Sequence, residues 1–316
     1  MGGVAVRVVF LGSGSFAIPC LEALLDAGHD VAAVVTQPDR EKGRGQALAP
    51  PPTKPVAERR GLPVLQPRRV REPEAQEALR RLAPELQVVV AFGQILPRGV
   101  IDIAPRGTVN VHASLLPKLR GAAPVQWAIA SGETETGVTT MLVDEGLDTG
   151  PTLLSRATPI GPDETAAELE PRLARLGAQL LLETVRGLEH GTLAPQPQDH
   201  ARATLAPLLK KEDGRIDWSL PAARVAARAR GFHPWPGAFT YHEGRLVKAL
   251  RVREAPGADA GADPGTVTAV GRDGVSVACG GASAVRLVEV QPESRNAMPA
   301  AAWARGARLR PGARLG

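Results

Sequence analysis

The sequence predicts a doubly wound α/β domain with a mostly parallel sheet, followed by a small all-β domain. In the first half, short apolar and often β-branched runs alternate with segments of helical periodicity. Such runs are typical of strands buried on both faces, as in a parallel sheet covered by helices. In the last third, short alternating segments are separated by Gly, Asp and Pro. At 316 residues the chain also exceeds a single hydrophobic core, so two domains are expected.

The strands of the α/β domain are expected where the apolar runs lie. The first run, Val6 to Gly12, ends in Gly-Ser-Gly-Ser and is followed by a helix with Leu21 and Leu24 on its inner face. The same reasoning places further strands at 31–35, 62–65, 86–92 and 108–112, and helices at 71–82 and 122–129. A β excursion over 137–160 should lead to a helix from about 163 to 190, which Pro171 should kink or delay.

Two proline-rich segments interrupt this pattern. Pro38 to Pro55 contains Gly43-Arg44-Gly45, and a loop of this length inside a compact domain is usually functional. Residues 191–206 are interpreted as a linker between a first domain (1–190) and a C-terminal domain (207–316). The latter should hold one helix and an OB-type barrel, with the helix at 221–230 and the strands at 238–242, 246–254, 265–270, 274–278 and 285–290.

Several classes of protein are disfavoured by composition. The N-terminus has no cleavable apolar segment, and nowhere do about eighteen apolar residues run together as a membrane span needs, so a cytoplasmic protein is expected. Cys20 and Cys279 are far apart and lie in no Cys-x-x-Cys pattern. A disulfide framework and a structural metal site are therefore not predicted.

The positive charge is concentrated in two parts of the chain. Residues 201–316 hold 18 Lys and Arg against 10 Asp and Glu, a net charge of +8, and residues 38–71 hold 9 against 3, a net charge of +6. Two basic regions fit a polyanionic partner such as nucleic acid. An arginine-rich composition with solvated faces explains the same numbers equally well.

The turn Gly12-Ser-Gly-Ser-Phe-Ala17 matches the G-x-G-x-x-A pattern of dinucleotide-binding sites. However, the second strand ends at Thr36-Gln37-Pro38, without the acidic residue that binds a ribose hydroxyl. A tight turn that packs the helix against the sheet is the preferred interpretation. No dinucleotide cofactor is predicted.

A second group of polar residues lies at the end of the last predicted parallel strand. Asn110 and His112 are two residues apart, so they project to the same face at the carboxyl end of the strand, where α/β sheets bind ligands. Asp148 lies in a turn-rich segment that a crossover could bring beside them. On spacing alone, these three residues are either a catalytic group or ordinary capping and turn residues.

The longer sequence around these residues resembles the folate-dependent formyltransferases. That family carries an Asn-x-His pair, a Ser-Leu-Leu-Pro loop and a later Asp in this order, here NVHASLLPKLRGAAPVQWAI and then TGVTTMLVDEGLDTGP. The resemblance continues into LLKKEDGRIDWSLPA and RGFHPWPGAFT, and reaches the C-terminal NAMPAAAWARGARLRPGARLG. It implies a Rossmann-like formyltransferase domain covering most of the first part of the chain.

The resemblance also implies roles for individual residues. Asn110, His112 and Asp148 match the family's catalytic trio, and the loop Ser114, Leu115, Leu116 and Pro117 matches its folate-contacting loop. The implied formyl donor is 10-formyltetrahydrofolate, and the implied acceptor is the free amino group of methionyl initiator tRNA. For tRNA contacts the resemblance nominates three basic residues, Arg44, Lys210 and Lys211, of which the two lysines have an equally simple reading as solvated residues. A monomer without a membrane partner is expected.

Other functions predict different features. A formyltransferase for an amino sugar nucleotide would share the trio, but it has no need of an extended basic surface. A glycinamide ribotide enzyme would resemble only the first domain. An oxidoreductase would need the missing acidic residue, and a nucleic-acid-binding protein without catalysis would leave the trio without a use.

Overall fold

The computed structural model describes residues 5–42, 47–256 and 261–316. The chain divides into two compact units, and neither is one continuous stretch. The first unit comprises Met1–Pro124, Thr136–Thr158 and Glu170–Pro207, and the second comprises Val125–Glu135, Pro159–Leu169 and Leu208–Gly316. This division differs from the predicted limits of 1–190 and 207–316, because two segments of the first part of the sequence pack with the C-terminal part.

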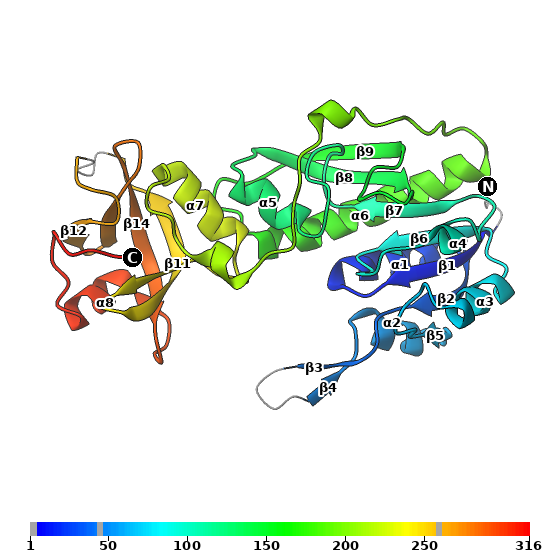
Figure 1. Cartoon of the computed structure of the whole chain (residues 1–316), viewed down its shortest axis with the longest axis horizontal. Coiled ribbons are helices and arrows are strands. Elements are labelled where there is room, and N and C mark those ends of the chain that lie inside the picture. Colours follow the sequence, from blue (N-terminus) through cyan, green and yellow to red (C-terminus); the bar gives the residue numbers. More distant parts are fainter. Residues whose placement is uncertain (1–4, 43–46, 257–260) are drawn as a thin grey trace. The chain divides into compact units, whose positions relative to one another are not determined.

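In the described residues, the first unit is built on a seven-stranded sheet with the order β5-β2-β1-β6-β7-β8-β9. The strands are β1 (Arg7–Gly12), β2 (Asp30–Val35), β5 (Val64–Leu65), β6 (Leu86–Val90), β7 (Thr108–His112), β8 (Glu135–Leu142) and β9 (Thr152–Pro159). The pairings from β5 to β7 are parallel, whereas β8 is antiparallel to β7. The predicted mostly parallel sheet is confirmed, and the β excursion forms its edge (Figure 1).

Helices connect these strands. They are α1 (Ile18–Asp26), α2 (Thr53–Arg59), α3 (Pro73–Arg81), α4 (Arg98–Ile101), α5 (Pro124–Ala130) and α6 (Ala166–Glu189), with 3-10 turns at Ser15–Ala17 (η1) and His200–Arg202 (η2). α6 continues through Pro171 rather than starting late at that residue. Pro171 lies early in the helix, so its missing N–H removes only one bond of a long ladder.

Both faces of the sheet are covered. On one face, Val9 packs in a cluster with Leu79 of α3 and Val100 of α4. On the opposite face, α6 approaches closely at Gly177, where a Cβ would lie 2.9 Å from Cγ1 of Val111 on β7. The alternation of side chains along each strand therefore buries both faces, as the continuous apolar runs of the sequence predicted.

The described residues of both proline-rich segments include paired backbone. The 38–55 segment contains the antiparallel strands β3 (Arg40–Lys42) and β4 (Ala47–Ala49), and α2 begins within it. The 191–206 segment belongs to the first unit, where Gln196 bridges Thr152 and Leu205 bridges Arg120. The segment interpreted as a linker is thus packed along the candidate catalytic unit.

The second unit is dominated by an antiparallel sheet with the order β10-β11-β14-β13-β12 in the described residues. Its strands are β10 (Phe239–His242), β11 (Arg245–Glu254), β12 (Val267–Gly271), β13 (Gly274–Cys279), β14 (Ser283–Pro292) and the short β15 (Met298–Pro299). The helical elements of its C-terminal segment are η3 (Lys211–Gly214), α7 (Ala222–Gly231) and α8 (Ala300–Gly306). Val275, Val277, Val285 and Leu287 are fully buried in its core. The prediction of a second, all-β domain with one preceding helix is confirmed, whereas α8 was not predicted.

The C-terminal residues lie between the two edge strands of this sheet. Leu315 N–H donates to Gly265 O beside β12 at 2.8 Å, and Gly316 N–H donates to Tyr241 O of β10 at 2.9 Å. The same segment therefore hydrogen-bonds to both ends of the strand path. This arrangement gives the sheet a barrel-like closure, which fits the expected OB-type architecture.

No helix in the described ranges is long and apolar enough to cross a bilayer. Cys20 and Cys279 are both buried and free. Burial raises the pKa of the Cys20 thiol to about 12 and that of the Cys279 thiol to about 11. Thiols with such pKa values are poor nucleophiles, so these residues have a packing role.

Candidate active site

The three predicted catalytic side chains come together at the carboxyl end of β7. Asn110 and His112 both reach Asp148, which lies on the connection between β8 and β9. Asn110 Nδ2 donates to Asp148 Oδ1 at 3.3 Å, and His112 Nδ1 lies 3.6 Å from Asp148 Oδ2. The pair two residues apart on the strand thus shares one face, as its spacing predicted.

The carboxylate of Asp148 is the centre of this group. Its Oδ2 also accepts a 2.8 Å hydrogen bond from the backbone N–H of Gly121, so both oxygens are held by donors. The side chain keeps 16% of its surface exposed, whereas that of His112 keeps 6%. Asp148 is therefore fixed in orientation and still accessible to a substrate. A carboxylate of this kind can accept a proton or hold a positively charged nitrogen.

The position of the proton on His112 follows from its partners. Nε2 lies 2.9 Å from the carbonyl oxygen of Leu119, and a carbonyl oxygen only accepts. Nε2 must therefore carry a hydrogen, and Nδ1 is the nitrogen that faces Asp148. Because a neutral ring has no hydrogen left for Nδ1, the His112–Asp148 pair is suited to share one additional proton. The left-handed backbone of Leu119, with a φ of 60°, turns its carbonyl toward the ring.

The predicted folate-contacting loop follows directly after β7. Ser114 is fully buried, and its hydroxyl donates to Lys118 O at 2.6 Å, so the side chain stabilises the loop itself. Buried Thr139 of β8 holds the same loop at two points: its hydroxyl donates to Ser114 O and accepts from Leu116 N–H. Leu115, Leu116 and Pro117 stay partly exposed. They form the part of the loop that a ligand can touch.

Gly121, Thr139 and Leu119 were not predicted from the sequence as site residues. Gly121 and Leu119 act through backbone atoms, which have no signature of their own in a sequence, although both lie inside the motif quoted above. Thr139 lies on β8 opposite His112, and this register could not be known beforehand. Among the described residues, no group of three or more His, Cys, Asp or Glu could hold a metal ion.

Gly121 offers a direct test of the site's backbone. Its φ is +121°, and a Cβ would lie 2.7 Å from the carbonyl oxygen of Ala206. We expect Gly121→Ala to lower the free energy of unfolding by about 1–3 kcal/mol. We also expect it to lower kcat, since the N–H that holds Asp148 must move. Thermal denaturation and steady-state kinetics measure the two effects.

Gly61→Ala is the matched control, because Gly61 also has a positive φ, of +69°, but nothing lies within 4 Å of its Cβ position. The control should lose some stability while keeping its turnover. If Gly121→Ala retained the kcat of the control, the Gly121 N–H would have no part in holding Asp148.

Three basic residues were nominated for contacts with tRNA, and the structure describes two of them. Arg44 lies outside the described residues. Lys210 and Lys211 are exposed at the start of η3 in the second unit, where the backbone N–H of Lys210 donates to Asp213 Oδ2 at 2.7 Å. Their proposed contacts stay predictions.

The glycine turn after β1 has its amides occupied. The N–H groups of Ser13 and Gly14 both donate to Ala91 O at 3.3 Å. At Gly12 a Cβ would lie 2.9 Å from the Cβ of Ala17, so the glycine allows the turn to pack closely. These contacts support the packing role of the turn and leave the two N–H groups unavailable to a pyrophosphate.

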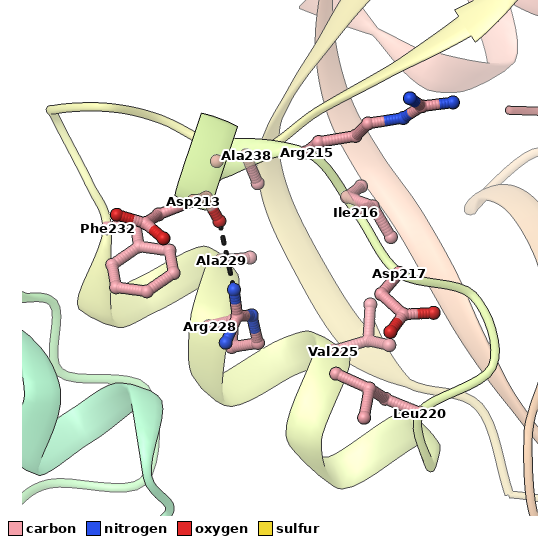
Figure 2. A pocket seen from close by; sticks show the side chains of 11 residues that line it. Asp213, Arg215, Ile216, Asp217, Leu220, Val225, Arg228, Ala229, Phe232 and Ala238 are labelled. Atoms are coloured by element: carbon pink, nitrogen blue, oxygen red, sulfur yellow. Dashed lines mark hydrogen bonds between the residues drawn. The ribbon is translucent and has the colours of Figure 1, made fainter. Parts of the chain in front are cut away.

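A separate small pocket lies within the second unit (Figure 2). In it, the Arg228 guanidinium donates to Asp213 O at 3.1 Å and lies 4.9 Å from the ring centroid of Phe232. The pKa of Arg228 is lowered, mainly by burial of its side chain. A guanidinium nevertheless stays charged at neutral pH. None of the catalytic trio lines this pocket. The arginine ties η3 to α7, which is a structural role.

The chain is similar to known proteins along nearly its whole length. The family model "Formyl transferase" matches residues 6–185, and "Formyl transferase, C-terminal domain" matches residues 208–308. The chain is 52% identical to the methionyl-tRNA formyltransferase of Citrifermentans bemidjiense, over 98% of this chain and 96% of that protein. It is 54% identical to that of Solibacter usitatus, over 98% of this chain and 99% of that protein.

A solved structure shares the fold at much lower identity. It is that of WlaRD, a sugar 3N-formyl transferase studied in the presence of dTDP and 5-N-formyl-THF, with a TM-score of 0.68 and 15% sequence identity. The likeness covers 93% of this chain and 100% of that chain. From the full-length identity and the two matched family models, we conclude that this chain belongs to the formyl transferase family.

Proposed function

We propose that this protein transfers the formyl group of 10-formyltetrahydrofolate to the free amino group of methionyl initiator tRNA, giving the formylated tRNA used to initiate translation. The observation that carries this proposal is the meeting of Asn110, His112 and Asp148 at the ligand-binding edge of a parallel sheet. The names of the two curated relatives, each at least 52% identical along nearly the whole chain, support the choice of acceptor.

In this proposal Asn110 stabilises the transition state. Attack of a neutral amine on the formyl carbon creates a tetrahedral centre with a developing oxyanion. Asn110 Nδ2 carries two hydrogens, of which one goes to Asp148, so the second is free for this oxygen. One well-placed donor of this kind is typically worth about a hundred- to a thousandfold in rate.

Asp148 and His112 handle the proton. An ester-linked aminoacyl amine should be less basic than a peptide α-amino group, whose pKa is about 7.7–8.0, so much of it is uncharged at neutral pH. As the new C–N bond forms, the attacking nitrogen becomes positive and gives a proton to the Asp148–His112 pair. The pair returns the proton to the folate nitrogen as its bond to the formyl carbon breaks. No net proton is gained or lost.

The basic regions supply the affinity for the acceptor in this proposal. The net charge of +8 over residues 201–316 and the basic 38–71 segment fit a phosphate backbone, and a small sugar nucleotide would need neither. Arg44, Lys210 and Lys211 are the residues proposed to contact tRNA. The Leu115–Pro117 loop is proposed to contact the folate.

Replacing Arg44 tests the proposed tRNA contact. Arg44→Ala should raise KM for tRNA with little change in kcat, because a phosphate contact contributes to binding throughout the reaction. The slope of log affinity against log salt should fall by about 1 in magnitude. Filter binding at several salt concentrations measures that slope.

Arg81→Ala is the matched control, since it removes one positive charge from an exposed position on α3 paired with Glu77. The control should behave like the unmodified protein. An Arg44→Ala variant with unchanged KM and salt slope would remove Arg44 from the tRNA-binding surface.

One experiment separates the proposed function from its alternative, a formyltransferase for an amino sugar nucleotide. The protein is incubated with labelled 10-formyltetrahydrofolate and one of three acceptors: methionyl initiator tRNA, methionyl elongator tRNA or an amino sugar nucleotide. Label should appear on the initiator tRNA alone. Label on the sugar nucleotide and none on either tRNA would replace the proposed acceptor with the alternative.

The proposal also includes a cytoplasmic location and a monomeric state. The cytoplasmic location follows from the proposed role, because translation is initiated in the cytoplasm. Light scattering after size-exclusion chromatography measures the molecular mass and so tests the monomeric state. A mass of twice that of the chain would contradict it.

A further inference from the structure

The side-chain amide of Gln198 joins two parts of the candidate active site. Gln198 is 8% exposed and lies in the 191–206 segment. Its Nε2 donates to the carbonyl oxygens of Asp148 at 2.9 Å and of Gly150 at 2.7 Å. Its Oε1 accepts from both Nε and Nη2 of Arg120, at 3.2 and 2.7 Å. All the hydrogen-bonding groups of this buried amide are therefore used, and its orientation is unambiguous.

The two carbonyl groups held by Gln198 flank the turn that presents the Asp148 carboxylate. Asp148 has a φ of 51°, a left-handed conformation that is uncommon for a residue other than glycine. At Gly150 a Cβ would lie 1.9 Å from the carbonyl oxygen of Leu142, so this part of the turn tolerates no side chain. Because the backbone conformation sets the direction of the side chain, the Gln198 amide also sets where the carboxylate points.

Arg120 connects this amide to the catalytic loop. Its side chain is 6% exposed, and its Nη2 also lies 3.1 Å from His200 Nδ1. The next residue is Gly121, whose N–H holds the Asp148 carboxylate. The 120–121 segment thus reaches Asp148 by two routes: directly to the carboxylate through a backbone amide, and to the backbone through Arg120 and Gln198.

We propose that Gln198 is a positioning residue for formyl transfer, which acts through Asp148 and is itself oriented by Arg120. Gln198 touches no reacting atom in this proposal. Its two donated bonds keep the Asp148 turn in the conformation that places the carboxylate beside Asn110 and His112. This inference rests on the catalytic role of Asp148 in the proposed function. Displacement of a catalytic group by about 1 Å can cost about a hundredfold in rate.

The test uses Gln198→Glu, which keeps an acceptor for Arg120 and replaces the donor Nε2 with an oxygen. That oxygen would face the two carbonyl oxygens and push the turn away. We expect kcat for formyl transfer to methionyl initiator tRNA to fall about 10- to 100-fold. KM for tRNA and for folate should stay within about twofold, since the lost bonds hold the Asp148 turn and contact no reacting atom. Gln196→Glu is the matched control, because Gln196 is an exposed glutamine of the same segment.

A double-mutant cycle with Asp148→Asn separates positioning from general structural damage. If Gln198 acts through Asp148, Gln198→Glu should cause no further loss of kcat in the Asp148→Asn background. The same fold-loss in both backgrounds would overturn the proposal, as would a folded Gln198→Glu variant with a kcat within twofold of the unmodified protein.

Two further outcomes distinguish a failure of the Gln198 proposal from a failure of the proposed function. Gln198→Met has a side chain of similar length and removes both donated bonds without adding charge. If neither this variant nor Gln198→Glu folds, Gln198 is a structural residue and the proposal fails. If the unmodified protein itself transfers no formyl group to methionyl initiator tRNA, the proposed function fails before Gln198 is tested.

Discussion

Asp148→Asn is expected to lower kcat for formyl transfer by between about 10²- and 10⁴-fold, the range typical of a lost general acid–base group. The carboxylate oxygens accept from Asn110 Nδ2 and from Gly121 N–H. An asparagine amide at this position must turn its NH₂ group toward one of these two donors. The variant therefore loses both the negative charge that the His112 proton needs and one of the bonds that orients the group. Single-turnover kinetics with saturating tRNA measures the chemical step.

The matched control for this change is Asp102→Asn, an exposed aspartate that pairs with Arg98 on the same unit. It should retain near-normal kcat, because an exposed ion pair contributes little to stability. Circular dichroism should show both variants folded, since each substitution replaces a carboxylate with an amide of equal size. Near-normal turnover by a folded Asp148→Asn variant would exclude Asp148 from the catalytic group.

Asn110→Ala is expected to lower kcat by about 10²- to 10³-fold while leaving KM for tRNA nearly unchanged. The amide supplies the hydrogen proposed for the developing oxyanion, and it also donates to Asp148 Oδ1. An interaction made only in the transition state affects kcat rather than binding. Steady-state kinetics over a range of tRNA concentrations separates the two parameters.

Asn296→Ala provides the same chemical change at an exposed position of the second unit. This control should be indistinguishable from the unmodified protein in turnover. A parallel rise in KM for tRNA with an unchanged kcat in Asn110→Ala would assign Asn110 to substrate binding and contradict its role as an oxyanion donor.

The strands of the parallel sheet could be predicted closely. The run expected at Val6 to Gly12 forms β1 over Arg7–Gly12, and β7 has the predicted limits of 108–112. A strand that is buried on both faces has a nearly continuous run of apolar residues, which can be recognised in the sequence. The strand expected at 86–92 ends at Val90 instead, because Ala91 adopts a φ of 45° and leaves the extended conformation.

Short elements stabilised by their surroundings were not predicted. The seven residues of α8 follow a proline, and Trp303 and Ala304 are buried in the core of the second unit. The short α2 and the β3–β4 hairpin lie in a segment whose prolines suggested a loop. A helix of so few residues is marginal alone, so its formation depends on packing rather than on local propensity.

The sequence alone determined the order of the strands and helices, and its resemblance to the formyltransferases indicated the chemistry. The two-residue spacing of Asn110 and His112 put them on one face of a strand, and the motif identified Asp148 as their partner. Only the tertiary structure decided how these groups meet. Asp148 is 38 residues from Asn110 and 50 from Gln198, and the return of the chain through β8 brings them within hydrogen-bonding distance. The two-residue period of a strand determines which face each of its own residues occupies. The contacts of backbone amides and buried side chains depend instead on packing between distant segments. For this reason the contacts of Gly121, Arg120 and Gln198 with Asp148 and with one another are visible only in the folded chain.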